Sequence, residues 1–173
     1  MRKGLLMVFT GDGKGKTTSA IGLSMRSAGN GLKVCFIQFI KGAWKYGEMD
    51  AVDRFDGLID FHVMGRGFTW KSDDLEKDKA AAREAWAFAQ NAINSDNYYL
   101  VVLDEFTYLL NYGVVDMDSV LSTLADKPSG MNVAVTGRDA PKPLTAAADL
   151  VSEIRALKHP YQAGIKAQKG IEF

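Results

Sequence analysis

Residues 5–28 read LLMVFTGDGKGKTTSAIGLSMRSA, and they predict a strand, a loop and a helix that together indicate the fold. The opening apolar run predicts a strand over Leu5–Thr10, and the close predicts a helix over Thr17–Ala28 that stops before Gly29. Between these elements lies a short loop with glycine at every second position from Gly11 to Gly15. A strand, a glycine-rich loop and a helix in this order are typical of a phosphate-binding unit.

The loop is suited to a polyphosphate. Its glycines let the backbone turn tightly and direct N–H groups inward, and the helix N-terminus adds partial positive charge. Lys16 is expected to reach the phosphate oxygens, as is the neighbouring Lys14, and the Thr17 hydroxyl is expected to ligate Mg²⁺. The common form of the motif has a glycine where this chain has Thr10, so the loop is one residue short. The expected phosphate ligands are Gly11, Asp12, Gly13, Lys14, Gly15, Lys16, Thr17 and Thr18.

The rest of the chain alternates short apolar runs with longer amphipathic segments, which is typical of an α/β fold. Most runs lack period-2 alternation, so they are expected to be strands covered on both faces of a mostly parallel sheet, with helices on both sides. Further helices are expected over Asp73–Ile93, with Trp86 in the core, and over Met117–Leu124. Besides the first strand, strands are expected over Val34–Ile40, Ile59–Met64, Tyr99–Leu103 and Val133–Thr136, with a weaker candidate at Leu150–Ile154.

Composition limits the number of domains and the kinds of partner. With 173 residues, 47% of them apolar, and no linker-like segment, the chain is expected to form a single domain over residues 1–173. Lys and Arg number 21, as do Asp and Glu, so the summed charge favours neither nucleic acid nor a membrane as partner. The one cysteine, Cys35, excludes an internal disulfide and is expected to be buried. No segment resembles a signal peptide or a membrane span, so a cytoplasmic protein is expected.

Two more strand ends carry charged residues. YYLVVLDEFTYLL places Asp104 and Glu105 at the carboxyl end of a buried strand, where one of them is expected to hold Mg²⁺ directly or through water. NVAVTGRDAP places Arg138 where it could neutralise phosphate charge, although a surface arginine fits the pattern nearly as well. The two histidines, His62 and His159, are expected to be structural.

Segments throughout the chain resemble one family. TGDGKGKTT, VCFIQFIKG, GRGFTW, VVLDE, TGR and ADLVSEIRALKHPYQAGIKAQKGIEF stand in this order in the chain, and they are similar to the P-loop type of ATP:corrinoid adenosyltransferase. The similarity runs over nearly the whole chain. GFTW together with the C-terminal KH, AG and KGIEF elements makes it specific. The resemblance implies a P-loop (RecA-like) domain.

The resemblance implies transfer of the 5′-deoxyadenosyl group of ATP to Co(I) of a corrinoid, with release of tripolyphosphate, in cobalamin biosynthesis or salvage. It implies that Phe68 and Trp70 lie against the lower face of the corrin and displace the axial base. Composition alone favours core packing for these aromatic residues, but the glycines at 65 and 67 and the charged residues that follow indicate a loop.

The resemblance also implies roles for residues at the phosphate site. Lys16, Thr17 and Glu105 are expected to be catalytic, with ATP as co-substrate. Mg²⁺ is expected on Thr17 and Glu105, with Asp104 as the second candidate, and Arg138 is retained as a further ATP contact.

A homodimer and an electron-donating flavin or flavodoxin-type reductant are implied as partners. The corrinoid stays open among cobalamin, cobinamide and cobyrinic acid a,c-diamide. Two other functions stay open as well. One is a nucleoside kinase in which Glu105 orients a substrate hydroxyl. The other is an ATP-switched interaction module that docks a protein through GFTW and the C-terminal tail.

Overall fold

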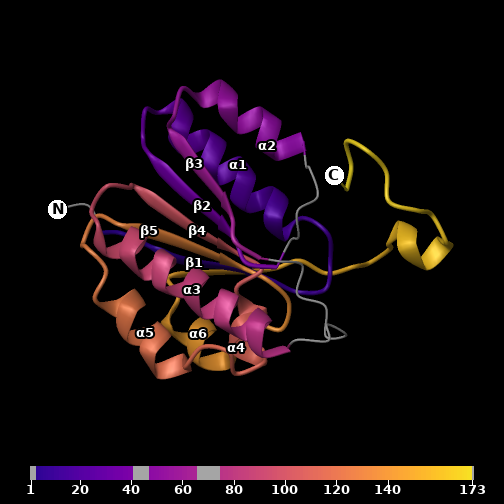
Figure 1. Cartoon of the computed structure of the whole chain (residues 1–173). Helices are drawn as coiled ribbons and strands as arrows, with labels where there is room; N and C mark the ends of the chain where they lie inside the picture. The colour runs from indigo at the N-terminus through magenta and orange to yellow at the C-terminus, as the bar shows by residue number, and fades with distance from the viewer. Residues whose placement is uncertain (1–2, 41–46, 66–74, 173) are drawn as a thin grey trace.

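The computed structural model describes residues 3–40, 47–65 and 75–172. In these residues six strands form one sheet in the order β3-β2-β4-β5-β1-β6 (Figure 1), and every neighbouring pair is parallel. The expected α/β fold class and all six expected strands, including the weaker last one, are therefore confirmed. The strands are β1 Leu6–Thr10, β2 Val34–Gln38, β3 Ile59–Val63, β4 Leu100–Asp104, β5 Asn132–Thr136 and β6 Leu150–Glu153.

Helices cover both faces of this sheet, as expected. One face carries α1 (Lys16–Gly29), α2 (Gly47–Val52) and the 3-10 turn η1 (Asp53–Phe55). The opposite face carries the remaining helices (Figure 1), which are α3 Leu75–Asn94, α4 Thr107–Asn111, α5 Met117–Ala125 and α6 Lys142–Ala147. The sequence did not predict α2, α4 or α6, because five or six residues are too few to show a helical period.

The central strands are buried from end to end, as their continuous apolar runs indicated. All five residues of each of β2, β4 and β5 are buried. Successive side chains alternate between two cores: Cys35 and Ile37 face the α3 side, and Val34 and Phe36 face the α1 side. Cys35 is fully buried as expected, and this burial raises the pKa of its thiol to about 12.

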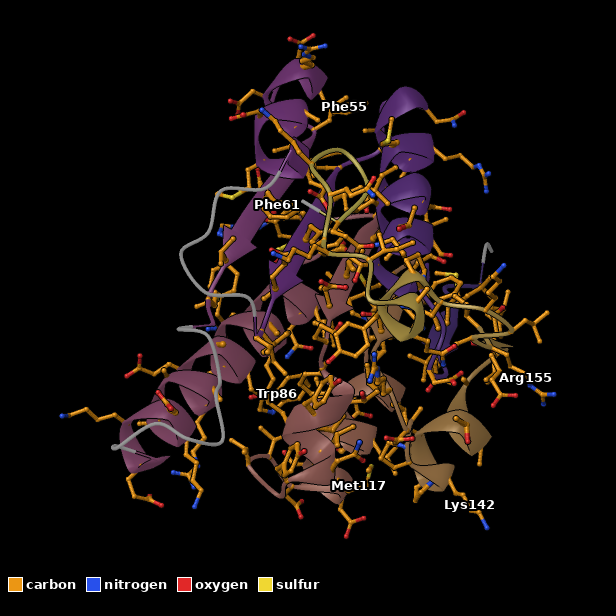
Figure 2. The ribbon with its side chains drawn as sticks, turned by 90° about the vertical axis from the view of Figure 1, so that its right-hand side faces the viewer. Phe55, Phe61, Trp86, Met117, Lys142 and Arg155 are labelled. Carbon is orange, nitrogen blue, oxygen red and sulfur yellow. The ribbon has the colours of Figure 1, made fainter. Side chains whose placement is uncertain are left out.

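The long helix α3 presents one apolar stripe to the sheet. Ala82, Trp86, Ala89 and Ile93, spaced at helical intervals, are all buried. The Trp86 ring lies 4.9 Å from the ring of Phe106, centroid to centroid, on the opposite side of the sheet from Phe55 and Phe61 (Figure 2). The expectation that Trp86 belongs to the core is confirmed.

Because all strands run the same way, their carboxyl ends meet along one edge of the sheet. β1 lies between β5 and β6, and β5 lies between β1 and β4. The loop after β1 is thereby brought beside the ends of β4, β5 and β6, which is where open α/β sheets bind ligands. Within the described parts of the chain, no helix has the length and apolar character needed to cross a bilayer.

Candidate functional site

The glycine-rich loop after β1 packs tightly against the chain that leaves β6. Gly11 and Gly15 have φ angles of 100° and 128°, which L side chains rarely adopt. A Cβ on Gly11 would lie 2.3 Å from the carbonyl oxygen of Ile154, and one on Gly13 would lie 2.8 Å from the carbonyl carbon of Arg155. Glycine at 11 and 13 is therefore required by close approach of a second backbone segment.

Two hydrogen bonds hold the loop in place. The Gly13 N–H donates to the carbonyl of Ile154 over 2.8 Å, so this N–H is already engaged within the protein. The Asp12 carboxylate accepts from the N–H of Ala156 over 3.1 Å. That bond lowers the pKa of Asp12. The Asp12 side chain thus helps to shape the loop, and its place among the expected phosphate ligands stays a prediction.

Lys16 begins α1 and is buried, with 7% of its surface exposed. Its Nζ donates to the carbonyl of Gly13 over 2.7 Å. Burial lowers the pKa of Lys16, and the nearby Glu105 carboxylate partly opposes that shift. Among the residues that the structure describes, no side chain hydrogen-bonds as a cap to the first turn of α1, so its N-terminal N–H groups can bind a ligand of the loop.

The end of β4 places two carboxylates differently. Asp104 is fully buried, and its oxygens accept from the Thr136 hydroxyl over 2.7 Å and from the Gln38 amide over 3.3 Å. Glu105 has a φ of 61°, in the left-handed region, and its side chain lines the cavity described below. Glu105 therefore reaches the site directly, whereas Asp104 lies beneath it.

The end of β5 carries Arg138 to the same place. Arg138 is exposed and lines the same cavity as the start of α1. Its carbonyl accepts from the Thr107 hydroxyl over 2.7 Å. The position at the cavity favours a ligand role for Arg138 over that of an ordinary surface arginine.

A cavity of about 650 Å³ joins these groups. Residues 12–18, Glu105 and Arg138 line its polar part. Its other part is apolar and lies between α1, α2, η1 and the faces of β2 and β3, where the rings of Phe36 and Phe61 stack 4.8 Å apart. Figure 2 shows Phe55 and Phe61 on this side of the sheet. The apolar lining residues are Ile21, Met25, Phe36, Ala51, Val52, Phe55, Ile59 and Phe61.

The C-terminal segment after β6 forms a further wall, which sequence reasoning did not predict in detail. Residues 170–172 line the cavity, and Glu172 pairs with Lys14 over 2.7 Å. His159, expected to be structural, lines this cavity and a second one of about 500 Å³ between the loop and the segment. The signal for this wall was the KGIEF element itself, which has no apolar period that would explain it as core.

Both histidines make the structural contacts expected of them: His159 Nδ1 accepts from the Tyr161 N–H over 3.3 Å at the start of the 3-10 turn η2 (Pro160–Ala163). His62 lies on β3 with its ring 4.7 Å from that of Phe88, edge to face. Burial lowers the pKa of His62. It does not line either cavity.

The residues that could hold a metal are few. The described part of the chain contains no group of three or more His, Cys, Asp or Glu side chains arranged for a metal. The Thr17 hydroxyl and the Glu105 carboxylate nevertheless line one cavity beside the phosphate loop. Two hard oxygen ligands suit Mg²⁺, which usually takes its remaining ligands from water and substrate phosphates. The expected aromatic pair, Phe68 and Trp70, lies outside the described residues.

Comparison with known proteins gives consistent matches. Residues 2–173 match the family described as ATP:corrinoid adenosyltransferase BtuR/CobO/CobP. The chain is 44% identical to a corrinoid adenosyltransferase of Pseudomonas aeruginosa, over 99% of this chain and 84% of that protein. It is 41% identical to one of Escherichia coli, over 99% and 86%.

Solved structures share the fold at low sequence identity. The flagellar accessory protein FlaH from Methanocaldococcus jannaschii has a TM-score of 0.57 at 13% identity, over 88% of this chain and 72% of that one. The RadB recombinase has a TM-score of 0.52 at 16% identity, over 92% and 78%. These two likenesses bear on the fold alone.

Proposed function

Because this chain belongs to the ATP:corrinoid adenosyltransferase family, we propose that it transfers the 5′-deoxyadenosyl group of ATP to the Co(I) centre of a corrinoid and releases tripolyphosphate. One observation carries the proposal beyond the family name. A single cavity joins a phosphate-binding loop to an apolar wall that includes Phe36, Phe55 and Phe61. Such a cavity suits a reaction between a triphosphate and a large, partly apolar second substrate.

The triphosphate lies on residues 11–18 in this proposal. Lys16, the N-terminus of α1 and Arg138, which line one cavity, meet its charge together. Lys14 joins them once it leaves Glu172. The low exposure of Lys16 strengthens its interaction with an anion, because little water screens the charge.

Mg²⁺ is held by Thr17 and Glu105. Glu105 is favoured over Asp104 as the ligand, because the oxygens of the buried Asp104 accept hydrogen bonds from Thr136 and Gln38. Bound there, Mg²⁺ supplies positive charge to the polyphosphate.

The adenosyl transfer itself requires no proton transfer by the protein. The Co(I) electron pair forms the bond to C5′, the C5′–O bond breaks, and its electrons leave with tripolyphosphate. No general base is needed, so neither histidine is given a role in proton transfer. The protein acts by stabilising a leaving group whose charge grows, through a fixed array of lysine, arginine and backbone N–H groups.

The corrinoid contacts rest on the family resemblance. Phe68 and Trp70 take the lower face of the corrin and displace its axial donor, which makes cobalt easier to reduce because the electron then enters a less antibonding orbital. A flavin or flavodoxin-type reductant and a homodimeric, cytoplasmic enzyme of a single domain belong to the same proposal. Cobalamin, cobinamide and cobyrinic acid a,c-diamide are the candidate substrates, in biosynthesis or salvage.

The test is an anaerobic assay with MgATP and chemically reduced cob(I)alamin. Loss of the Co(I) absorbance, with light-sensitive adenosylcobalamin and tripolyphosphate as products, is the expected result. ADP as the product, or no change of the corrinoid while ATP binds, contradicts the proposal and favours the kinase or the interaction module.

A further inference from the structure

Hydrogen bonds tie the end of β4 and the start of α4 to the end of β5. We refer to the bonded residues 104–111 and 136–139 as the strand-end clamp. Its two central residues are Thr107 and Thr136, both fully buried. Neither of them lines either of the two cavities described above. Each one hydrogen-bonds to the backbone of a residue that does, Thr136 to Glu105 and Thr107 to Arg138.

Thr136 holds Glu105. Its hydroxyl donates to the Asp104 carboxylate over 2.7 Å and accepts from the Glu105 N–H over 2.9 Å. Donor and acceptor roles of the one hydroxyl are thus both used across the two strands. The Glu105 backbone is in the left-handed region, with φ of 61°, a conformation that a residue with a Cβ keeps only where its surroundings fix it.

Gln38 supports this half of the clamp from β2. Its side-chain amide donates to the other Asp104 oxygen over 3.3 Å, and Gln38 itself is only 1% exposed. Asp104 is therefore held from both sides, so it can orient the Thr136 hydroxyl.

Thr107 holds Arg138. Its hydroxyl donates to the Arg138 carbonyl over 2.7 Å, and Asn111 donates to the Asp139 carbonyl over 3.1 Å. Close approach makes this contact possible: a Cβ on Gly137 would lie 2.0 Å from the Thr107 hydroxyl oxygen. The side chain of Arg138 leaves the backbone at this bonded point.

We propose that Thr136 and Thr107 are positioning residues of the reaction: Thr136 aims the Glu105 carboxylate at the metal, and Thr107 aims the Arg138 guanidinium at the triphosphate. The proposal rests on the function proposed above, which gives Glu105 and Arg138 these ligands. The two threonines should differ in which ligand their loss affects. Loss of the Thr136 hydroxyl acts on the metal, and loss of the Thr107 hydroxyl acts on the nucleotide whether or not metal is present.

Valine variants test this because valine has nearly the volume of threonine and lacks the hydroxyl. The dissociation constant of ATP is measured by titration calorimetry, once with Mg²⁺ and once with EDTA. The constant in EDTA divided by the constant with Mg²⁺ is the factor by which the metal strengthens binding. For Thr136→Val we expect this ratio to fall by roughly 10- to 100-fold, as for other residues that orient a metal ligand. Thr136→Ser, which keeps the hydroxyl, should restore it.

For Thr107→Val we expect both dissociation constants to rise together, by roughly two- to tenfold, with their ratio unchanged. Thr123→Val is the matched control. The Thr123 hydroxyl likewise connects two elements, α3 and α5: it accepts from Gln90 over 3.0 Å and donates to the Ser119 carbonyl over 3.0 Å, but Thr123 lines neither cavity. Its variant should leave both constants as in the wild type.

Several outcomes would overturn the inference. A wild-type ratio in Thr136→Val, or a serine variant as impaired as the valine one, means that Thr136 only packs. An unchanged ATP affinity in Thr107→Val means that Thr107 does not position Arg138 for the nucleotide. If Thr136→Val does not fold, Thr136→Ala takes its place, since its smaller side chain leaves room for water beside Asp104, and the same fall in ratio is expected.

The same titrations separate this inference from the proposed function. Wild-type protein that binds MgATP with the expected ratio but forms no adenosylcobalamin contradicts the function and leaves the clamp supported. A wild-type ratio near one contradicts the metal assignment, and with it the Thr136 half of the inference.

Discussion

Lys16 is the buried cation of the proposed phosphate site. It is buried at the start of α1 and bonded to the Gly13 carbonyl over 2.7 Å. A lysine held this way exchanges a neutral backbone partner for phosphate when the substrate arrives, and its charge is then poorly screened.

We expect Lys16→Ala to lower the rate of adenosyl transfer at saturating ATP by about two to three orders of magnitude. One preorganised contact to a developing charge is worth roughly 3 to 4 kcal/mol. The rate is measured by loss of Co(I) absorbance. Lys127→Ala is the control, because Lys127 also donates to a backbone carbonyl, that of Gly4 over 2.8 Å, and lines neither cavity. More than a tenth of wild-type rate in Lys16→Ala counts against the assignment.

The lowered pKa of Lys16 makes ATP binding dependent on pH. Its first cause is burial, which disfavours the charged form, so without ligand the folded chain releases this proton below the ordinary lysine value of 10.5. In that window the unfolded chain binds more protons, and stability from this group rises with pH. A bound triphosphate raises the pKa again, so ATP binding takes up a proton there and weakens as pH rises.

Calorimetry in buffers of different ionisation enthalpy measures this uptake. We expect this proton uptake in the wild type at pH values below 10.5, the ordinary lysine pKa, and its absence in Lys16→Ala. Equal uptake in both proteins would assign the proton to another group.

Trp70 belongs to the corrinoid half of the proposal. We expect Trp70→Ala to form less four-coordinate Co(II) corrinoid while the ATP dissociation constant stays within about twofold, because in this proposal the ring contacts the corrin and not the phosphates. Absorption and electron paramagnetic resonance spectra of the bound Co(II) corrinoid measure the effect. Wild-type spectra in this variant would refute the assignment.

At the scale of elements, the ends of β4 and β5 matter most. Both strands are fully buried, so their ends cannot shift without disturbing the core. The backbone positions of Glu105 and Arg138, which lie just after these strands, are therefore fixed as well. Sites built at the ends of core strands hold their geometry better than sites on free loops.

Gly137 tests how tightly the two ends fit. Its φ is 143°, and a Cβ there would lie 2.0 Å from the Thr107 hydroxyl oxygen. We expect Gly137→Ala to lower the free energy of unfolding by at least about 2 kcal/mol, through strain and overpacking together. Urea denaturation measures the change.

Gly113→Ala is the matched control. Gly113 also has a positive φ, of 61°, but a Cβ there meets none of the described atoms within 4 Å. Its cost should be about 1 kcal/mol, from backbone strain alone. Equal costs for the two variants would show that the Thr107 contact is not tight.

At the scale of the whole molecule, the C-terminal segment contacts the phosphate loop near the N-terminus. Lys14 and Glu172, 158 positions apart, pair over 2.7 Å. The C-terminal segment thereby places a carboxylate beside the site proposed for the triphosphate. ATP must displace or share that lysine.

We expect Glu172→Gln to lower the ATP dissociation constant by up to about fivefold, since a partly exposed ion pair is worth less than about 1 kcal/mol. The gain should shrink as salt is raised. Glu153→Gln is the control, because Glu153 pairs with Arg155 over 2.9 Å and lines neither cavity. Weaker ATP binding in Glu172→Gln would mean that the carboxylate helps to hold the substrate.

Much of this architecture could be predicted from the order of residues along the chain. Buried parallel strands need unbroken apolar runs, so β2, β4 and β5 were visible as such. The spacing of Trp86 and Ala89 predicted the buried stripe of α3. The glycines at 11, 13 and 15 marked the loop, because few other residues allow such turns. These features depend on residues that are close together in the chain, so the sequence alone shows them.

Only the tertiary structure decided which residues share the site and which lie beneath it. Asp104 and Glu105 are neighbours in sequence, yet one is buried under hydrogen bonds from Gln38 and Thr136 and the other lines the cavity. The apolar wall with Phe55, the placement of His159 and the pairing of Lys14 with Glu172 likewise depend on segments far apart in the chain. Such contacts are set by strand order and packing, and these leave no periodic pattern along the sequence.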